Sequence, residues 1–327
     1  MIDAAEAQAM AAEALAHWPA DGRPPRLVKM RENVVFQIWL ADGRPAALRL
    51  HRPGYQSAAA IAAELDWTAE LARRGQLVPA PVATRAGGWT CRAGGRVASV
   101  VRWLDGAAVG SAEQPLAGGA AEQAGLFHRI GALVGGLHAA TDAISFVCPP
   151  ERPRWDIDGL LGEAPLWGRF WDSPGLTATE RALLSDARAA ARQALEARLA
   201  AGADVGLIHA DVLRENVLDG PGGLALIDFD DSGHGFRLYD LGTALVQSLE
   251  EPHLSELARA LADGYGVARG VAPPGVQDLT LFVLLRCLAS CGWIASRAAA
   301  DDPRQRLYAR RATGLARHWL AGTTPFG

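Results

Sequence analysis

Cysteine is scarce in this chain, and basic runs are missing. Only four cysteines occur among 327 residues, at positions 91, 148, 287 and 291, and no two of them form a C-x-x-C pair. This pattern argues against a disulfide framework and favours reduced thiols, as in the cytoplasm. Lys and Arg number 32 against 36 Asp and Glu, which gives a formal net charge of -4 at pH 7. Without a basic block, nucleic acid is not an expected partner.

We expect neither a secretory leader nor a membrane-spanning run in this sequence. The N-terminal stretch MIDAAEAQAMAAEAL contains acids in place of the basic region that a signal peptide needs. We expect no run to cross a membrane, and therefore a soluble, cytoplasmic protein without a membrane partner. Hydrophobic residues make up 50% of the 327 residues, enough for a core in each of two lobes. Composition does not predict the oligomeric state.

Acidic and amide residues gather in one stretch, from Val205 to Ala244. Residues 206–208 form a short apolar run that predicts a buried strand. His209, Asp211 and Asn216 follow it in the order H-x-D-x-x-x-x-N. An Asp and an Asn are therefore expected on one loop.

A group of carboxylates follows two further short strands. Residues 217–218 and 224–227 are apolar, and the Asp-Gly-Pro-Gly-Gly turn between them predicts a hairpin. Asp228, Asp230 and Asp231 come directly after this hairpin. Phosphoryl transfer from a nucleotide needs such residues, because Mg²⁺ prefers hard oxygen ligands and a carboxylate accepts the proton of the attacking hydroxyl.

The spacing matches that of kinases, in which an Asp is followed by an Asn and then by an Asp that opens the next loop. Asp228 and Phe229 match the start of D-F-G, with Asp230 in place of the glycine, and Leu-Tyr-Asp-Leu-Gly follows at 238–242. With these motifs the chain resembles the aminoglycoside phosphotransferase and choline kinase-like family, nearest in look to its stress-response and homoserine kinase members. A generic acidic loop after a hairpin is the alternative, but it does not explain the joint spacing.

The resemblance implies an α+β, bilobal, protein-kinase-like fold with a small, mainly β N-terminal lobe and a larger helical C-terminal lobe. It implies an ATP-dependent phosphotransferase that uses Mg²⁺ and moves the γ-phosphate to a hydroxyl acceptor. By motif match, Asp211 is the catalytic base, and Asn216 and Asp228 are the Mg²⁺ ligands. Asp240 is expected to support the catalytic loop and His209 to brace it.

The N-terminal lobe, residues 1–104, is expected to bind the nucleotide. Residues 34–40 and 46–50 alternate in hydropathy around an Asp-Gly turn and predict paired strands. Residues 57–75 predict a helix that ends at a glycine. In a kinase-like fold these strands lie beside the phosphates of the nucleotide.

Two departures from the kinase pattern lie in this lobe. The candidate phosphate loop, M-R-E-N, ends at Asn33 and contains no glycine. Arg49 stands where the family has Lys, and a guanidinium group can hold phosphate oxygens with two bonds; an exposed strand Arg is the alternative. By resemblance, Glu64 on the following helix is the expected partner of Arg49, with Glu70 the competing candidate and an ordinary solvated helix Glu the alternative.

The two lobes are expected to meet after the last strand of the N-terminal lobe. We interpret Trp103 and Leu104 as the hinge at which adenine binds through backbone groups, and an ordinary turn at Asp105-Gly106 is the alternative. Residues 105–327 then form the C-terminal lobe, which carries the catalytic loop and the acceptor site. Its remaining segments predict mostly helices with one apolar face.

One histidine, one tryptophan-rich segment and one arginine of the C-terminal lobe have more than one interpretation. His138 closes an apolar helical stripe and is expected to be packed or hydrogen-bonded. Residues 149–175 are irregular and rich in Trp, which favours either an acceptor-binding or lid segment or ordinary packing. Arg214 adjoins Leu213, where many relatives carry a basic residue, and could replace that residue beside the transferring phosphate.

The acceptor is the least determined feature. A polycationic aminoglycoside would need a site rich in carboxylates, and the candidates are Asp230, Asp231, Glu250 and Glu251. Solvated loop carboxylates are the alternative for Asp230 and Asp231. Two function classes stay open: an active kinase acting on a small molecule or on a protein Ser/Thr, and a catalytically silent nucleotide-binding module.

Overall fold

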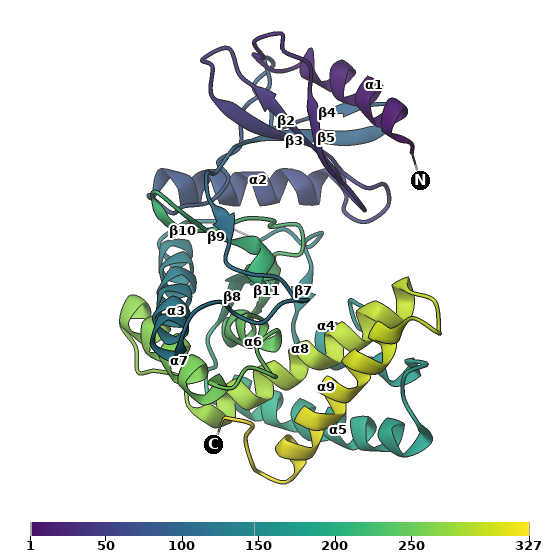
Figure 1. Cartoon of the computed structure of the whole chain (residues 1–327), viewed down its shortest axis with the longest axis vertical. Coiled ribbons are helices and arrows are strands. Elements are labelled where there is room, and N and C mark those ends of the chain that lie inside the picture. The colour runs from purple at the N-terminus through teal and green to yellow at the C-terminus, as the bar shows by residue number, and fades with distance from the viewer. Residues whose placement is uncertain (1, 147, 327) are drawn as a thin grey trace. The chain divides into compact units, whose positions relative to one another are not determined.

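The computed structural model describes residues 2–146 and 148–326, and the chain divides into two compact units (Figure 1). Unit 1 comprises Met1–Ala107, Phe146–Arg152 and Asp219–Asp230, and unit 2 comprises Ala108–Ser145, Pro153–Leu218 and Asp231–Gly327. The predicted lobe boundary after residue 104 falls near the end of the first segment. The two short segments that we expected in the C-terminal lobe belong to unit 1, so Asp228 belongs to unit 1 as well.

Unit 1 is built on an antiparallel sheet with the strand order β1-β2-β3-β5-β4. Its strands are β1 (Arg26–Met30), β2 (Val34–Trp39), β3 (Pro45–Leu50), β4 (Thr90–Ala93) and β5 (Arg96–Arg102). The predicted strand pair corresponds to β2 and β3, which pair along their whole lengths. Buried residues alternate along both strands, because successive side chains of a strand point to opposite faces.

Two helices complete most of unit 1, namely α1 (Ala4–Leu15) and α2 (Ala58–Arg73). The buried face of α1 consists of alanines, which pack in one core with the sheet residues Phe36, Ile38 and Leu48. Ser57 caps the first turn of α2, and the buried face of α2 includes Glu64. A buried carboxylate on a helix needs a partner that compensates its charge.

The other strands form two small sheets. One has the order β10-β9-β6, with β6 (Ala107–Ala108), β9 (Val217–Gly220) and β10 (Gly223–Leu226). Strands β9 and β10 are the predicted hairpin. The second has the order β7-β11-β8, with β7 (Arg154–Trp155), β8 (Val205–Ile208) and β11 (Gly233–Phe236), and it lies in unit 2. The predicted strand before the catalytic loop is β8.

Helices make up most of unit 2. They are α3 (Ala120–Asp142), α4 (Ile157–Leu161), α5 (Ala178–Ala200), α6 (Leu238–Val246), α7 (Leu254–Arg269), α8 (Val276–Arg297) and α9 (Pro303–Leu320), with the short 3-10 turns η1 (Phe170–Asp172) and η2 (Arg214–Asn216). Helices α3 and α7 lie side by side at close range (Figure 1). A Cβ atom at Gly131 would lie 2.1 Å from Leu261 O, and one at Gly264 would lie 2.0 Å from His128 O. Glycine is required at both contacts because the backbones approach too closely for any side chain.

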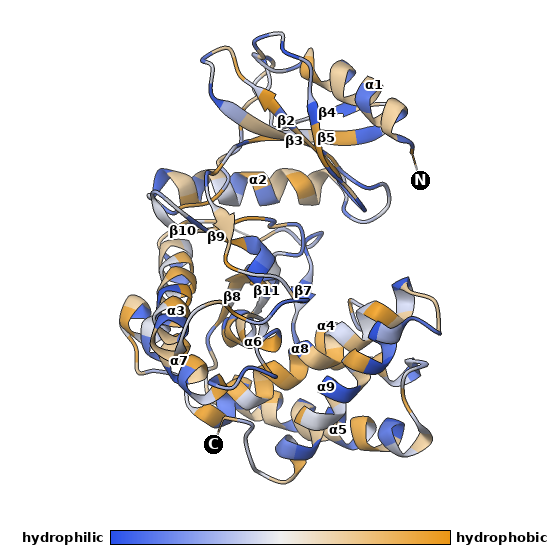
Figure 2. Ribbon diagram, viewed as in Figure 1, coloured by the Kyte–Doolittle hydropathy of each residue, from blue (hydrophilic) through white to orange (hydrophobic). Residues whose placement is uncertain are grey.

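Helix α8 contradicts the expectation that no run of this sequence could cross a membrane. By length and composition it is apolar enough to cross a membrane, and Figure 2 shows apolar residues along it. In the folded chain 83% of its most apolar window is buried inside the protein. Its apolar surface is therefore used for packing, against α6 and α9 among others.

Candidate active site

The predicted catalytic loop of unit 2 begins where β8 ends. The backbone N–H of Asp211 donates to Nδ1 of His209 (3.2 Å). Asn216 Nδ2 donates to the Asp211 carboxylate oxygen Oδ2 (2.8 Å) and to its backbone oxygen (2.9 Å). With the amide nitrogen turned toward Asp211, the amide oxygen of Asn216 is the atom left for a metal. The structure thus brings Asp211 and Asn216 together, as the motif predicts.

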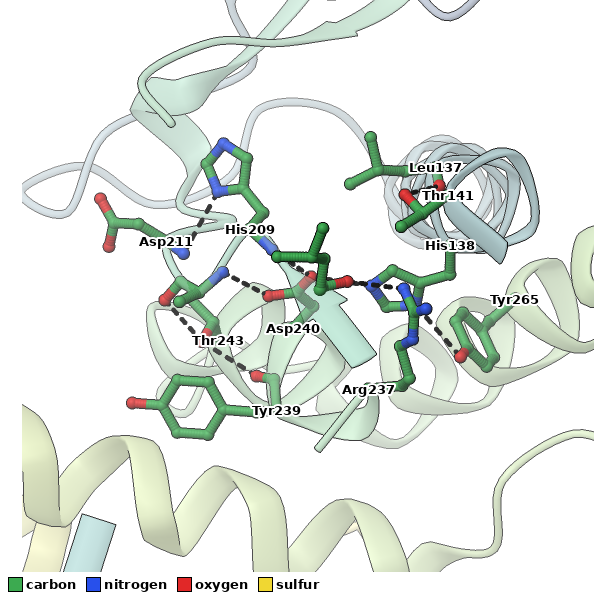
Figure 3. A network of polar contacts seen from close by, with 12 residues as sticks. Leu137, His138, Thr141, His209, Asp211, Arg237, Tyr239, Asp240, Thr243 and Tyr265 are labelled. Atoms are coloured by element: carbon green, nitrogen blue, oxygen red, sulfur yellow. Dashed lines mark hydrogen bonds and ion pairs between the residues drawn. The ribbon is translucent and has the colours of Figure 1, made fainter. Parts of the chain in front are cut away.

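Asp240, at the start of α6, holds this loop from the inside of unit 2. Its Oδ2 atom accepts the backbone N–H of His209 (2.9 Å), and its Oδ1 atom accepts that of Ala210 (2.6 Å) (Figure 3). Ala210 has a φ of 65°, a left-handed conformation that costs an L-residue about 1–2 kcal/mol. The short bond to Asp240 holds Ala210 in this conformation and so orients Asp211. The predicted supporting role of Asp240 is confirmed.

His138 completes the contacts of Asp240. Its Nε2 atom lies 3.0 Å from Asp240 Oδ2, and its Nδ1 atom lies 3.2 Å from the hydroxyl of Tyr265. Burial lowers the pKa of His138 below its usual value, so the imidazole is neutral. The pKa of Asp240 stays below its usual value despite burial, because His138 donates to it. A carboxylate only accepts, so Nε2 carries the proton and the Tyr265 hydroxyl donates to Nδ1. His138 is the hydrogen-bonded structural residue that we expected.

Arg286 of α8 is a residue of this site that sequence reasoning missed. Its Nη2 atom donates to Asp211 Oδ1 (2.9 Å), and its Nη1 atom donates to Ala210 O (3.0 Å). The residue is 4% exposed. A single cation inside an apolar helix was a usable signal, because a buried arginine is rare unless it is paired.

Unit 1 brings together the predicted phosphate anchor and one predicted metal ligand. Arg49 Nη2 lies 2.7 Å from Asp228 Oδ1, and Arg49 Nη1 lies 3.8 Å from Asp230 Oδ1. Burial opposes the charge of Arg49, but Asp228 and Asp230 raise the pKa of the guanidinium above its ordinary value. Asp228 has a φ of 65°, so its backbone is also in the left-handed region. Arg49 is therefore a paired site residue and not an isolated strand arginine.

The predicted pairing of Arg49 with Glu64 is wrong. Glu64 forms its ion pair with Arg152 (3.3 Å), from the segment Phe146–Arg152. Burial raises the pKa of Glu64 to about 7, an increase that Arg152 opposes. Arg152 Nη2 also donates to the backbone oxygens of Phe229 (3.0 Å) and Asp230 (3.1 Å). Glu64 therefore acts on the loop after β10 through Arg152, a residue that the kinase pattern gave no reason to select.

The remaining predicted nucleotide-binding residues also lie in unit 1. Asn33 Nδ2 donates to Asp230 Oδ2 (3.0 Å), and Asn33 Oδ1 accepts the backbone N–H of Arg52 (2.9 Å). Asn33 thus fastens the glycine-free loop to the loop after β10. Trp103 and Leu104 follow β5 and are half-buried, with Trp103 N donating to Pro45 O (3.3 Å). Their contact with adenine stays a prediction.

Arg214 does not have the role that we expected for it. The side chain is 3% exposed, and its Nη2 atom donates to Glu251 (2.8 Å) and to the Ser248 hydroxyl (2.9 Å). Nη1 donates to Gln114 O (3.1 Å). Because the guanidinium is committed to these buried partners, it is not available to a transferring phosphate.

The tryptophan-rich segment is packed rather than open. Trp155 and Trp167 are 1% and 6% exposed, and their ring centroids lie 5.0 Å apart at an interplanar angle of 88°. Trp155 also stacks on Tyr239 of α6 at 5.2 Å. Of the two interpretations of residues 149–175, packing accounts for these two tryptophans.

The two predicted metal ligands, Asn216 of unit 2 and Asp228 of unit 1, each carry an oxygen donor of the kind that Mg²⁺ prefers. The described residues contain no group of three or more His, Cys, Asp and Glu side chains that could hold a metal. Mg²⁺ does not need such a group, because it keeps several waters and uses one or two protein oxygens beside phosphate oxygens. Asn216 and Asp228 offer an amide oxygen and a carboxylate, which are donors of the required kind.

The fold and these residues define a kinase-like phosphotransferase. The family model of the phosphotransferase enzyme family matches residues 25–279, so the chain belongs to this family. An uncharacterized protein of Deinococcus radiodurans is 30% identical over 290 residues, which cover 84% of this chain and 78% of that protein. A homoserine kinase of Neisseria meningitidis serogroup B is 29% identical over 224 residues, which cover 67% of this chain and 65% of that protein.

Solved structures give the same result. A microcompartment-associated aminopropanol kinase matches with a TM-score of 0.80 and 28% identity, covering 98% of each chain. An amicoumacin kinase solved with AMP-PNP and Ca²⁺ matches with a TM-score of 0.69 and 18% identity, covering 99% of this chain and 97% of that one; this second likeness shows the fold alone. The predicted family and the α+β, kinase-like fold are confirmed.

Proposed function

We propose that the protein is an ATP-dependent kinase of the cytoplasm that transfers the γ-phosphate to a hydroxyl group of a small molecule. The observation that carries this proposal is the oriented carboxylate of Asp211. Asn216 and Arg286 each bond one of its two oxygens, at 2.8 and 2.9 Å. A carboxylate fixed in this way can accept the proton of an attacking hydroxyl as that hydroxyl reaches the phosphorus.

We assign the binding of the metal and of the nucleotide phosphates to the other site residues. Asn216 and Asp228 would hold Mg²⁺, which, when bound, neutralises charge on the nucleotide phosphates. Arg49 would hold phosphate oxygens and would exchange its contact with Asp228 for them. Glu64, through Arg152, would hold the backbone after Asp228 in place. These roles need no group beyond the nucleotide, the metal and the acceptor.

For the acceptor we propose a small amino alcohol in place of a polycation. Three of the four carboxylates considered for a polycation form ion pairs with arginines: Asp230 with Arg49, Glu250 with Arg311 and Glu251 with Arg214. Carboxylates committed to arginines in this way do not form the acidic site that a polycation needs. The names of two relatives, an aminopropanol kinase and a homoserine kinase, support the same class.

Asp211→Ala tests this function. With Mg²⁺-ATP and a panel of amino alcohols that includes aminopropanol and homoserine, we expect turnover to fall about 10²-fold or more. Nucleotide affinity, measured by calorimetry, should stay unchanged because Asp211 does not bind the nucleotide. Asp186→Ala, an exposed aspartate of α5, is the matched control and should behave as wild type.

Three outcomes would contradict the proposal. Wild-type turnover in Asp211→Ala would mean that another group accepts the proton. Nucleotide binding without phosphate transfer to any alcohol would favour a silent nucleotide-binding module, and transfer to a protein Ser/Thr in place of the amino alcohols would favour a protein kinase.

A further inference from the structure

Arg286 makes a two-point contact with the catalytic loop. Nη2 donates to Asp211 Oδ1 at 2.9 Å and Nη1 donates to Ala210 O at 3.0 Å. Both acceptors belong to consecutive residues, so the planar guanidinium group fixes their relative orientation. Asn216 bonds the second oxygen of Asp211 at 2.8 Å. With both oxygens bonded, the carboxylate cannot rotate without breaking a hydrogen bond.

The guanidinium group of Arg286 is itself held in place. Its central carbon lies 4.5 Å from the centroid of the Trp167 ring, within the range of a cation–π contact. Trp167 packs edge to face on Trp155, and Trp155 Nε1 donates to Asp231 O (2.8 Å). Helix α8 supplies the arginine, and the tryptophan-rich segment supplies the surface on which it rests. All of these residues belong to unit 2.

The charge of Arg286 is maintained despite its burial. Burial opposes the charged form, but Asp211 and Tyr239 keep the pKa of Arg286 above its ordinary value. A charged guanidinium group 2.9 Å from Asp211 forms a stronger hydrogen bond to the carboxylate than a neutral donor would. The contact therefore acts on the orientation of Asp211.

We propose that Arg286, seated on Trp167, is the positioning residue of the catalytic base Asp211. The inference rests on the proposed function, in which Asp211 accepts the proton of the acceptor. Arg286 gives the carboxylate a fixed direction toward the hydroxyl. Misplacement of a reacting group by about 1 Å costs roughly 10²-fold in rate.

Two substitutions separate charge from geometry. Arg286→Gln keeps a hydrogen-bond donor and removes the charge. We expect kcat to fall roughly 10²-fold, with the KM for ATP changed less than about twofold. Arg286→Lys keeps the charge and loses the planar two-point contact, so kcat should fall in this variant as well, whereas a role of the charge alone would leave kcat unchanged.

The measurement uses Mg²⁺-ATP with aminopropanol as the acceptor, and homoserine if the wild type does not turn over aminopropanol. Arg311→Gln is the matched control, because Arg311 of α9 also pairs with a carboxylate, Glu250, at 2.7 Å and is largely buried in unit 2. It does not contact Asp211, and we expect wild-type kinetics. Melting temperatures establish which variants fold.

The outcomes separate the inference from the proposed function. An inactive Asp211→Ala variant beside an Arg286→Gln variant with wild-type kcat would overturn the positioning role and leave the proposed function intact. Full turnover in Asp211→Ala would overturn the function itself. If Arg286→Gln does not fold, Arg286→Lys decides, and a wild-type kcat in that variant would overturn the inference.

Discussion

Replacing Asp240 by Asn measures how strongly one buried carboxylate holds the catalytic loop. Asp240 is 0% exposed and accepts three N–H groups, from His209 (2.9 Å), Ala210 (2.6 Å) and His138 (3.0 Å). Asn has one oxygen where Asp has two. Asp240→Asn therefore removes the charge and leaves at least one N–H donor opposite an NH₂ group.

The magnitude follows from the number and kind of bonds. Because His138 is neutral, the contact is a set of charged hydrogen bonds and not an ion pair. A hydrogen bond to a charged group contributes about 1.5–3 kcal/mol, and a buried donor left without a partner costs about 1–3 kcal/mol. We expect the free energy of unfolding to fall by about 3 kcal/mol, which lowers Tm by roughly 6–12 °C for a unit of this size. Turnover should fall as well, because Ala210 loses the bond that holds its left-handed backbone.

Urea denaturation and turnover with Mg²⁺-ATP together check this prediction. Asp278→Asn is the control, since the Asp278 carboxylate also accepts hydrogen bonds, from Arg198 at 2.7 Å, but its side chain is 38% exposed. A surface pair of this kind contributes about 0–1 kcal/mol. If Asp240→Asn and Asp278→Asn lose the same small amount of stability, the carboxylate of Asp240 does not hold the loop.

Four further predictions concern the metal, the phosphate anchor and pH. Asn216→Ala and Asp228→Ala should each weaken the binding of Mg²⁺-nucleotide, measured by calorimetry. Asp228→Ala should weaken it more, because this substitution removes a charge. Equal affinity of the wild type and Asp228→Ala would refute the metal site. Arg49→Lys should bind nucleotide more weakly because a planar contact is lost, and unchanged affinity would mean that charge alone carries the contact. The pKa of Glu64 is about 7 in the folded chain and 4.5 ordinarily, so unfolding between these two pH values releases a proton. The free energy of unfolding should therefore fall as the pH rises from 4.5 to about 7. Denaturation of Glu64→Gln at pH 5 and pH 8 should lack this decrease. Burial holds His138 neutral in the folded chain, whereas the unfolded chain can bind a proton there. The free energy of unfolding should therefore also fall as the pH decreases below about 6.5. The same decrease in a His138→Gln variant would mean that His138 is not its cause.

Local structure was largely determined by the sequence. Thr177 and Glu180, three positions apart, cap the first turn of α5 with reciprocal hydrogen bonds, which is the capping-box pattern. The Asp-Gly-Pro-Gly-Gly turn joins β9 to β10. The apolar alternation of residues 34–40 and 46–50 corresponds to β2 and β3. The close spacing of Asp211 and Asn216 along the chain also sufficed to predict that they lie on one loop, where they are in contact. These features depend on residues a few positions apart, whose geometry the backbone itself restricts.

Partner choice among charged residues was decided by the tertiary structure. Glu64 pairs with Arg152 and not with Arg49, Arg214 turns to Glu251, and Arg286 reaches Asp211 from α8. An arginine side chain is long and flexible, so its sequence position does not fix which carboxylate it meets. Burial makes the choice, because an arginine or carboxylate inside the protein must find a partner among groups that the packing of distant helices brings near it.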